Sequence, residues 1–102
     1  MITEYVRFAL PVGITREEVV AGMREVAPRW QQEPNLVRKT FILDPDLKFT
    51  GAFYLWMDRQ SAEAAHGTAW RARVLRTYGS VPEIQYFDTP LVVDNALGQV
   101  IE

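Results

Sequence analysis

The chain has 102 residues, of which 11 are basic and 13 are acidic, so its net charge is -2, and it contains no cysteine. A chain of this length can bury one hydrophobic core, so we expect a single domain over residues 1–102. The balanced charge, with no run of like charges, argues against nucleic acid and membrane surfaces as partners. The lack of cysteine excludes disulfides, thiolate metal sites and a cysteine nucleophile.

The composition also indicates the compartment. No segment approaches the roughly 20 apolar residues that a transmembrane helix needs. The first ten residues contain Glu4 and Arg7 and lack the long apolar stretch of a signal peptide. We therefore expect a cytoplasmic protein.

The first third of the chain predicts a strand followed by a helix. Residues Thr3–Leu10 alternate between two faces, and Pro11 and Gly13 end the strand. Thr15 and Glu18 fit a capping box, which marks a helix start. The helix carries an apolar stripe formed by Val19, Met23, Val26 and Trp30.

The middle of the chain predicts a hairpin. Strands at Leu36–Leu43 and Phe49–Met57 are joined by the turn signal Asp44-Pro45-Asp46. The second of these strands has large side chains on both faces: one face has Phe53, Leu55 and Met57, and the other has Ala52, Tyr54 and Trp56. Both faces of the sheet should therefore be covered.

The last third predicts a second helix, a fourth strand and a tail. The helix begins at Asp58, is interrupted at Gly67 and ends at Gly79, so we expect it to be bent or broken. Val81–Thr89 reads as a strand. The tail, about residues 90–102, contains the apolar run Leu91-Val92-Val93.

The order strand, helix, strand, strand, helix, strand defines an α+β fold of the ferredoxin-like βαββαβ type, with both helices on one face of a four-stranded antiparallel sheet. The other face keeps apolar side chains, and soluble monomers rarely expose a contiguous apolar patch of several hundred Å². A second copy is the simplest cover, so we predict a homodimer that forms a dimeric α+β barrel. In this dimer the tail straps onto the partner; alternatively, it folds back on its own sheet.

Several short strings, in the same order along the chain, resemble the YdhR-like monooxygenase family of the dimeric α+β barrel superfamily. These strings are Gln32-Glu33-Pro34, Lys39, the run Gly51–Asp58 with Tyr54-Leu55, Ser61-Ala62, Gly79, and Phe87-Asp88 with Pro90. The resemblance implies a ferredoxin-like fold, a homodimer, a pocket between sheet and helices, and an oxygenase activity.

Relatives in that superfamily imply two chemistries. One is cofactor-free oxygenation of electron-rich phenols, in which the substrate carbanion itself reduces dioxygen; it requires no cofactor. The other is haem degradation, which needs an axial histidine and a polar residue near the haem. Here His66 is the sole histidine, and the first strand offers Tyr5 and Arg7 where an asparagine is expected, so the sequence departs from the haem-degrading pattern.

The candidate catalytic residues are His66 and Tyr54, as proton acceptors. Histidine is the side chain that ordinarily titrates near neutral pH, and His66 lies beside the helix break. The competing interpretation of His66 is a surface or capping residue. A single histidine without a second ligand motif predicts no metal site.

The candidate substrate-binding residues are aromatic or charged. Trp30, Trp56 and Trp70 could form a flat slot for an aromatic ligand, or simply an aromatic core. The remaining candidates are polar side chains that need a rim, a partner or a ligand, namely Arg7, Lys39, Arg73 and Tyr86. For Arg7 the alternative is a position at the dimer seam. For Lys39 the alternative is a solvated position on an edge strand.

Three functions remain open from the sequence. The first is a cofactor-independent oxygenase, or a cyclase-like barrel, acting on an aromatic or polyketide-like substrate; it requires a pocket of at least about 300 Å³ lined by Trp56, Trp70 and His66. The second is a non-catalytic dimer that binds a small apolar molecule. The third is a scaffold for another protein, which would leave apolar surface exposed after dimerisation.

Overall fold

The computed structural model describes all residues 1–102. Its elements, in chain order, are β1 (Ile2–Ala9), α1 (Arg16–Gln31), β2 (Leu36–Leu43), β3 (Phe49–Trp56), α2 (Arg59–Ala65), α3 (Thr68–Tyr78), β4 (Glu83–Asp88), β5 (Val92–Asp94) and β6 (Gln99–Ile101). No helix is long and apolar enough to cross a membrane.

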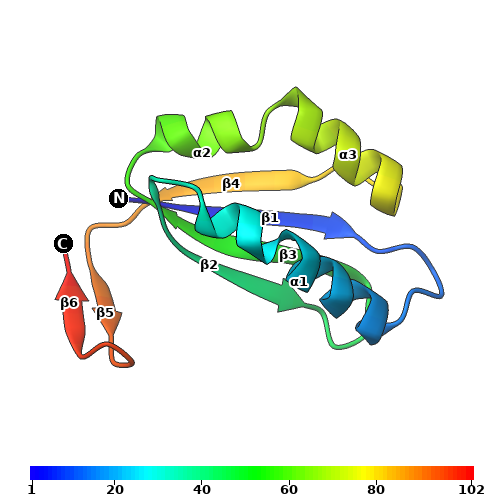
Figure 1. The fold of residues 1–102 in the computed structure, drawn as a ribbon, viewed down its shortest axis with the longest axis horizontal. Helices are drawn as coiled ribbons and strands as arrows, with labels where there is room; N and C mark the ends of the chain where they lie inside the picture. The colour runs from blue at the N-terminus through cyan, green and yellow to red at the C-terminus, as the bar shows by residue number, and fades with distance from the viewer.

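The main sheet has four antiparallel strands in the order β2-β3-β1-β4, and the three helices lie on one side of it (Figure 1). The predicted ferredoxin-like α+β fold is confirmed. The two central strands, β1 and β3, each have a neighbour on both sides, so their helix-facing side chains form the floor under the helices.

Local signals in the sequence place the helix ends. The Thr15 side chain accepts from the Glu18 backbone while the Glu18 side chain accepts from Thr15, which is the expected capping box. The second helix is broken as predicted: α2 ends at Ala65, and α3 begins at Thr68. Gly79 ends α3 with φ +74°, a left-handed conformation that suits glycine.

Gly51 sets the close approach of the two central strands. It pairs with Arg7 in β1, and a Cβ atom at this position would lie 1.9 Å from the Val6 carbonyl oxygen. Such a contact is a steric clash with backbone, which cannot rotate away. Only glycine fits here without shifting β1 from β3.

The core lies between the sheet and the helices and is strongly aromatic. Its buried members are Val6, Trp30, Ala52, Tyr54, Trp56 and Ala62. The alternation read from β3 is confirmed, because Ala52, Tyr54 and Trp56 lie in this core. The opposite face of the sheet carries Phe53, which stacks on Tyr5 at 4.7 Å between ring centroids.

The tail forms a small sheet of its own. Strands β5 and β6 pair with each other and with no strand of the main sheet, and they lie to one side of it (Figure 1). Gly98, with φ +64°, and an Asp94 side chain that accepts from the Leu97 backbone shape their turn. An ion pair between Arg38 of β2 and Asp94 ties this hairpin to the domain.

Candidate active site

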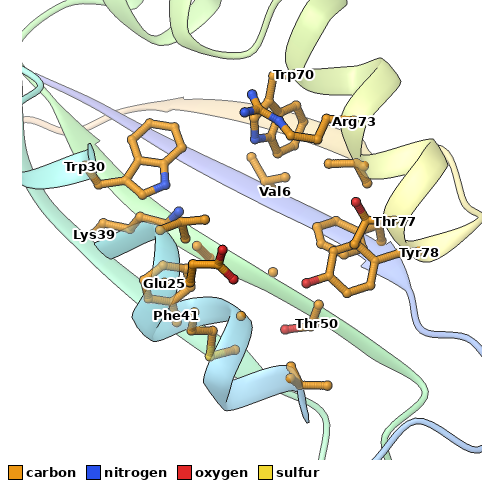
Figure 2. A pocket seen from close by; sticks show the side chains of 18 of the residues that line it. Val6, Glu25, Trp30, Lys39, Phe41, Thr50, Trp70, Arg73, Thr77 and Tyr78 are labelled. Atoms are coloured by element: carbon orange, nitrogen blue, oxygen red, sulfur yellow. The ribbon is translucent and has the colours of Figure 1, made fainter. Parts of the chain in front are cut away.

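A cavity of about 320 Å³ lies between the sheet, α1 and α3 (Figure 2). Most of its wall is apolar: β1 and β3 contribute Val6, Ala52 and Tyr54, while the helices contribute Trp30, Trp70 and Val74. Protein cavities that bind small organic ligands begin at about this volume. The cavity is therefore large enough for a ligand of one or two aromatic rings, and more where it opens to solvent.

Lys39 places an amine among aromatic rings in this cavity. It belongs to β2 and pairs with Tyr54 of β3, so its side chain lies on the helix side of the sheet. Its Nζ atom is 4.0 Å from the ring centroid of Trp30, 4.0 Å from that of Phe41 and 4.6 Å from that of Tyr54. No carboxyl group forms an ion pair with it.

This environment disfavours a charged ammonium group. Burial, and secondarily the positive charge of Arg29, lower the pKa of Lys39 to about 7, although the charge of Glu4 acts in the opposite direction. The cation–π contacts favour the ammonium form but replace only part of its hydration. Near neutral pH, Lys39 is therefore a mixture of ammonium and free amine, and the free amine can accept a proton.

The pKa of Tyr54 is shifted in the opposite direction to that of Lys39. Burial and the nearby charge of Glu4 raise the pKa of Tyr54 well above its ordinary value. The phenol therefore keeps its proton at physiological pH. This argues against the expected use of Tyr54 as a proton acceptor and favours hydrogen-bond donation to a ligand.

Polar side chains border the rest of the cavity. Figure 2 shows Glu25 from α1, Thr50 from β3, and Arg73, Thr77 and Tyr78 from α3 around it. Arg73 is exposed, so one side of the cavity has a solvated, basic rim. A ligand could place an apolar ring inside and a polar or anionic group at this rim.

A second feature, next to the cavity, is a fully buried hydrogen-bond network around Glu4. The Glu4 residue has 0% exposure although it lies in the central strand β1. Trp56 Nε1 donates to Glu4 Oε1 at 2.9 Å, and His66 Nδ1 lies 2.8 Å from a carboxyl oxygen of Glu4. Tyr86 of β4 adds to the electrostatic environment of Glu4: burial and the nearby Glu4 charge raise the pKa of Tyr86 to about 12.

His66 connects this network to the cavity wall. Its ring lies 4.4 Å from that of Trp70 and 4.7 Å from that of Tyr54, and both of these residues line the cavity. Its Nε2 atom is buried and has no hydrogen-bond partner. Glu4 thus holds His66 by one nitrogen and leaves the other free behind the aromatic wall.

The structure divides the predicted site residues into three groups. The cavity is lined by Tyr54, Trp30, Trp70, Lys39 and Arg73. His66, Trp56 and Tyr86 belong instead to the Glu4 network, so the expected wall of Trp56, Trp70 and His66 is present only through Trp70. Arg7 lies apart from both, on the other face of the sheet, with its guanidinium 4.3 Å from the Phe49 ring centroid and 3.8 Å from Glu83.

Sequence reasoning missed Glu4 as a site residue. A signal was present: Glu4 shares its face of the strand with Val6 and Phe8, so the alternation places a carboxyl group on the core side. A charged side chain on the buried face of a central strand requires partners. His66, Trp56 and Tyr86 supply them from three other elements.

No protein-family model matches this sequence, and no curated protein matches it. The fold, however, resembles several solved structures. SnoaB, a cofactor-independent oxygenase from Streptomyces nogalater, has a TM-score of 0.64 and 20% identity over 90% of this chain and 95% of its own. NE2512, a protein of unknown function from Nitrosomonas europaea, has a TM-score of 0.71 and 14% identity over 90% of this chain and 91% of its own.

An antibiotic biosynthesis monooxygenase has a TM-score of 0.61 and 16% identity, over 87% of this chain and 98% of its own. Similarity at these identities concerns the fold. The chain therefore has the ferredoxin-like α+β fold found in antibiotic biosynthesis monooxygenases, and its activity has to be argued from its own cavity.

Proposed function

We propose that this protein is a cofactor-independent monooxygenase of the YdhR-like type, acting on a small aromatic or polyketide-like substrate in the cavity. The observation that carries the proposal is the Lys39 amine, held inside a ligand-sized aromatic cavity with no carboxyl partner. The fold that the chain shares with SnoaB, itself a cofactor-independent oxygenase, supports it.

The proposed chemistry begins with a proton transfer. The free amine of Lys39 takes a proton from an activated CH₂ group of the bound substrate, and the resulting ammonium faces the carbanion. The carbanion reduces dioxygen; one oxygen atom enters the substrate as a new C=O group, and the other leaves as water. Tyr54 donates a hydrogen bond to the developing oxyanion, and Trp30 and Trp70 hold the ring and exclude water.

In this proposal Lys39, rather than His66, is the direct proton acceptor. His66 has a fully buried side chain, whereas Lys39 lines the cavity. His66 then keeps Trp70 and Tyr54 in position from behind. Trp56 and Tyr86 support His66 indirectly, because they surround its partner Glu4.

The proposal predicts oxygen consumption that increases with pH. With 1,8-dihydroxyanthrone as probe, the rate should rise through about pH 7, because only the neutral form of Lys39 accepts a proton and its pKa is about 7. Lys39→Met should reduce this rate by about 100-fold, the usual contribution of a general base. An oxygen electrode and chromatography of the anthraquinone product measure both effects.

The control is Lys48→Met, because Lys48 is the only other lysine and is exposed. It should keep the wild-type rate. If Lys39→Met also keeps that rate, Lys39 is not the base. If the wild type binds the probe but consumes no oxygen, the non-catalytic binding function takes the place of the enzyme.

We also propose that the protein is a homodimer in which the open faces of two sheets meet. That face carries Phe53 and Phe87, which are 43% and 51% exposed. The tail adds further exposed apolar residues that could strap onto the partner: Leu91, Val93, Leu97 and Val100.

The dimer predicts a mass of two chains in sedimentation velocity. Phe53→Glu should shift the protein to the monomer, because it places a charge in the interface. Val12→Glu is the matched control, since Val12 is fully exposed in the loop after β1. A wild-type monomer, or equal dissociation in both variants, would contradict this interface.

A further inference from the structure

The Lys39 amine also has the surroundings of a nucleophile. We propose that Lys39 forms a Schiff base with aromatic aldehydes or ketones that carry an acidic substituent and enter the cavity. This activity goes beyond the proposed oxygenase function, because it needs no oxygen and applies to carbonyl compounds. The argument rests on the position of the amine, on the proton donor beside it and on the basic rim opposite.

The position of Lys39 favours attack on a bound aromatic carbonyl. Trp30, Phe41 and Tyr54 surround its Nζ atom at 4.0 to 4.6 Å from their ring centroids, so a flat ligand that stacks among these rings brings its substituents close to the amine. The cavity volume of about 320 Å³ exceeds the roughly 150 Å³ of an apolar cavity that holds benzene. A benzaldehyde-sized ligand therefore fits.

The protonation states suit the reaction. The lowered pKa of Lys39, about 7, leaves a large fraction of the amine neutral at physiological pH, and a lysine desolvated in an apolar pocket is a recognised nucleophile for carbonyl groups. Tyr54 keeps its phenolic proton, because burial and Glu4 raise its pKa. It can therefore protonate the departing hydroxyl group.

The step balances without an oxidant or a reductant. The Nζ lone pair forms a bond to the carbonyl carbon, and the C–O double bond becomes a hydroxyl group after proton transfer from nitrogen to oxygen. Tyr54 passes its proton to this hydroxyl as it takes up the remaining N–H proton, so water leaves while the C=N bond forms and no free tyrosinate accumulates.

Arg73 is the reason why we expect the ligand to carry an acidic substituent. It lines the same cavity from α3, has no carboxyl partner, and is exposed at the rim (Figure 2). A guanidinium group binds a carboxylate through two parallel hydrogen bonds. A ligand with an aldehyde inside and a carboxylate at the rim would use both the neutral Lys39 amine and the Arg73 guanidinium.

The experiment is reductive trapping with 4-carboxybenzaldehyde and sodium cyanoborohydride at pH 7 without oxygen, followed by peptide mapping with mass spectrometry. The chain has only two lysines, Lys39 and Lys48, so each molecule contains its own control. Lys39 should be modified at least ~10-fold faster than Lys48, since an ordinary lysine is almost entirely protonated at pH 7. Its rate should saturate with probe concentration, whereas that of Lys48 should increase linearly.

One further variant, compared with two probes, tests the site. Arg73→Gln should slow modification of Lys39 by 4-carboxybenzaldehyde more than modification by benzaldehyde, which lacks the carboxylate. Equal rates at Lys39 and Lys48, or a rate at Lys39 that does not saturate, would overturn the proposal. Because trapping is anaerobic, it succeeds or fails independently of oxygen consumption, so failure of the oxygenase function remains distinguishable.

Discussion

Replacing Glu4 with alanine is expected to destabilise the protein by about 3–5 kcal/mol, the largest loss predicted for any single side chain here. The change removes the acceptor of Trp56 Nε1 and the partner of His66 Nδ1, two groups that are fully buried and reach no water. Each unsatisfied group costs about 1–3 kcal/mol, and the cavity left by the side chain adds to this. In a domain of this size the melting temperature should fall by more than about 10 °C.

The matched control is Glu83→Ala. Glu83 is also a strand glutamate with a basic neighbour, Arg7 at 3.8 Å, but its side chain is 78% exposed and that of Arg7 is 43% exposed. An exposed pair contributes at most about 1 kcal/mol, so this variant should unfold close to the wild type. Denaturant unfolding at pH 7 measures both variants, and equal losses would show that the buried network around Glu4 adds nothing specific.

The sequence predicted the fold because its signals are local. Capping by Thr15, the break at Gly67 and the left-handed end at Gly79 each depend on a few neighbouring residues. The alternation in Phe49–Met57 likewise grouped Tyr54 and Trp56 on one face of the strand, and the structure buries that face under the helices. Periodicity and turn chemistry are sufficient for such features, since they require no knowledge of distant partners.

The site was predicted less completely because it depends on distant partners. Lys39 and Trp70 were identified as candidates, yet their common cavity depends on how far α1 and α3 stand from the sheet. His66 was expected near the helix break, but its partner Glu4 is 62 residues away in the chain. Pairing between β1 and its two neighbours creates that contact, and local patterns do not encode it.

The conformation of the tail was also beyond what local sequence patterns encode. Its apolar run predicted burial, against the partner or against the chain's own sheet. The Asp94 and Gly98 turn folds it into a hairpin, and in the single chain Val93 and Val100 are 65% and 62% exposed, so burial against a partner stays a prediction. A two-stranded hairpin is marginally stable alone, so the Arg38–Asp94 ion pair helps to hold it against the domain.

Lys39→Met should make the protein more stable, and the gain should depend on pH. Methionine fills similar volume and has no charge to desolvate, and replacing buried charges by apolar groups often stabilises by about 1–4 kcal/mol. At pH 6 we expect a gain of about 2 kcal/mol in the free energy of unfolding. The same variant should lose the proposed oxygen consumption, so unfolding cannot explain the lost activity.

The direction of the pH dependence follows from the two protonation states. An unfolded lysine has a pKa of about 10.4, whereas burial lowers the pKa of Lys39 to about 7 in the folded protein. Below pH 7 both states bind the proton, and the cost of burying the charge is present in full. Between about pH 7 and 10 only the unfolded state keeps the proton, so the stability of the wild type increases with pH relative to the variant.

Urea unfolding of wild type and Lys39→Met at pH 6, 8 and 9.5 measures this difference. The difference should be largest at pH 6 and shrink steadily, because all other titrating groups are common to both proteins and cancel. Lys48→Met, at an exposed lysine, should show a small difference that is the same at every pH. A constant difference for Lys39→Met would mean that the amine titrates as it does in water, which would remove the physical basis for Lys39 as a proton acceptor and as a nucleophile at neutral pH.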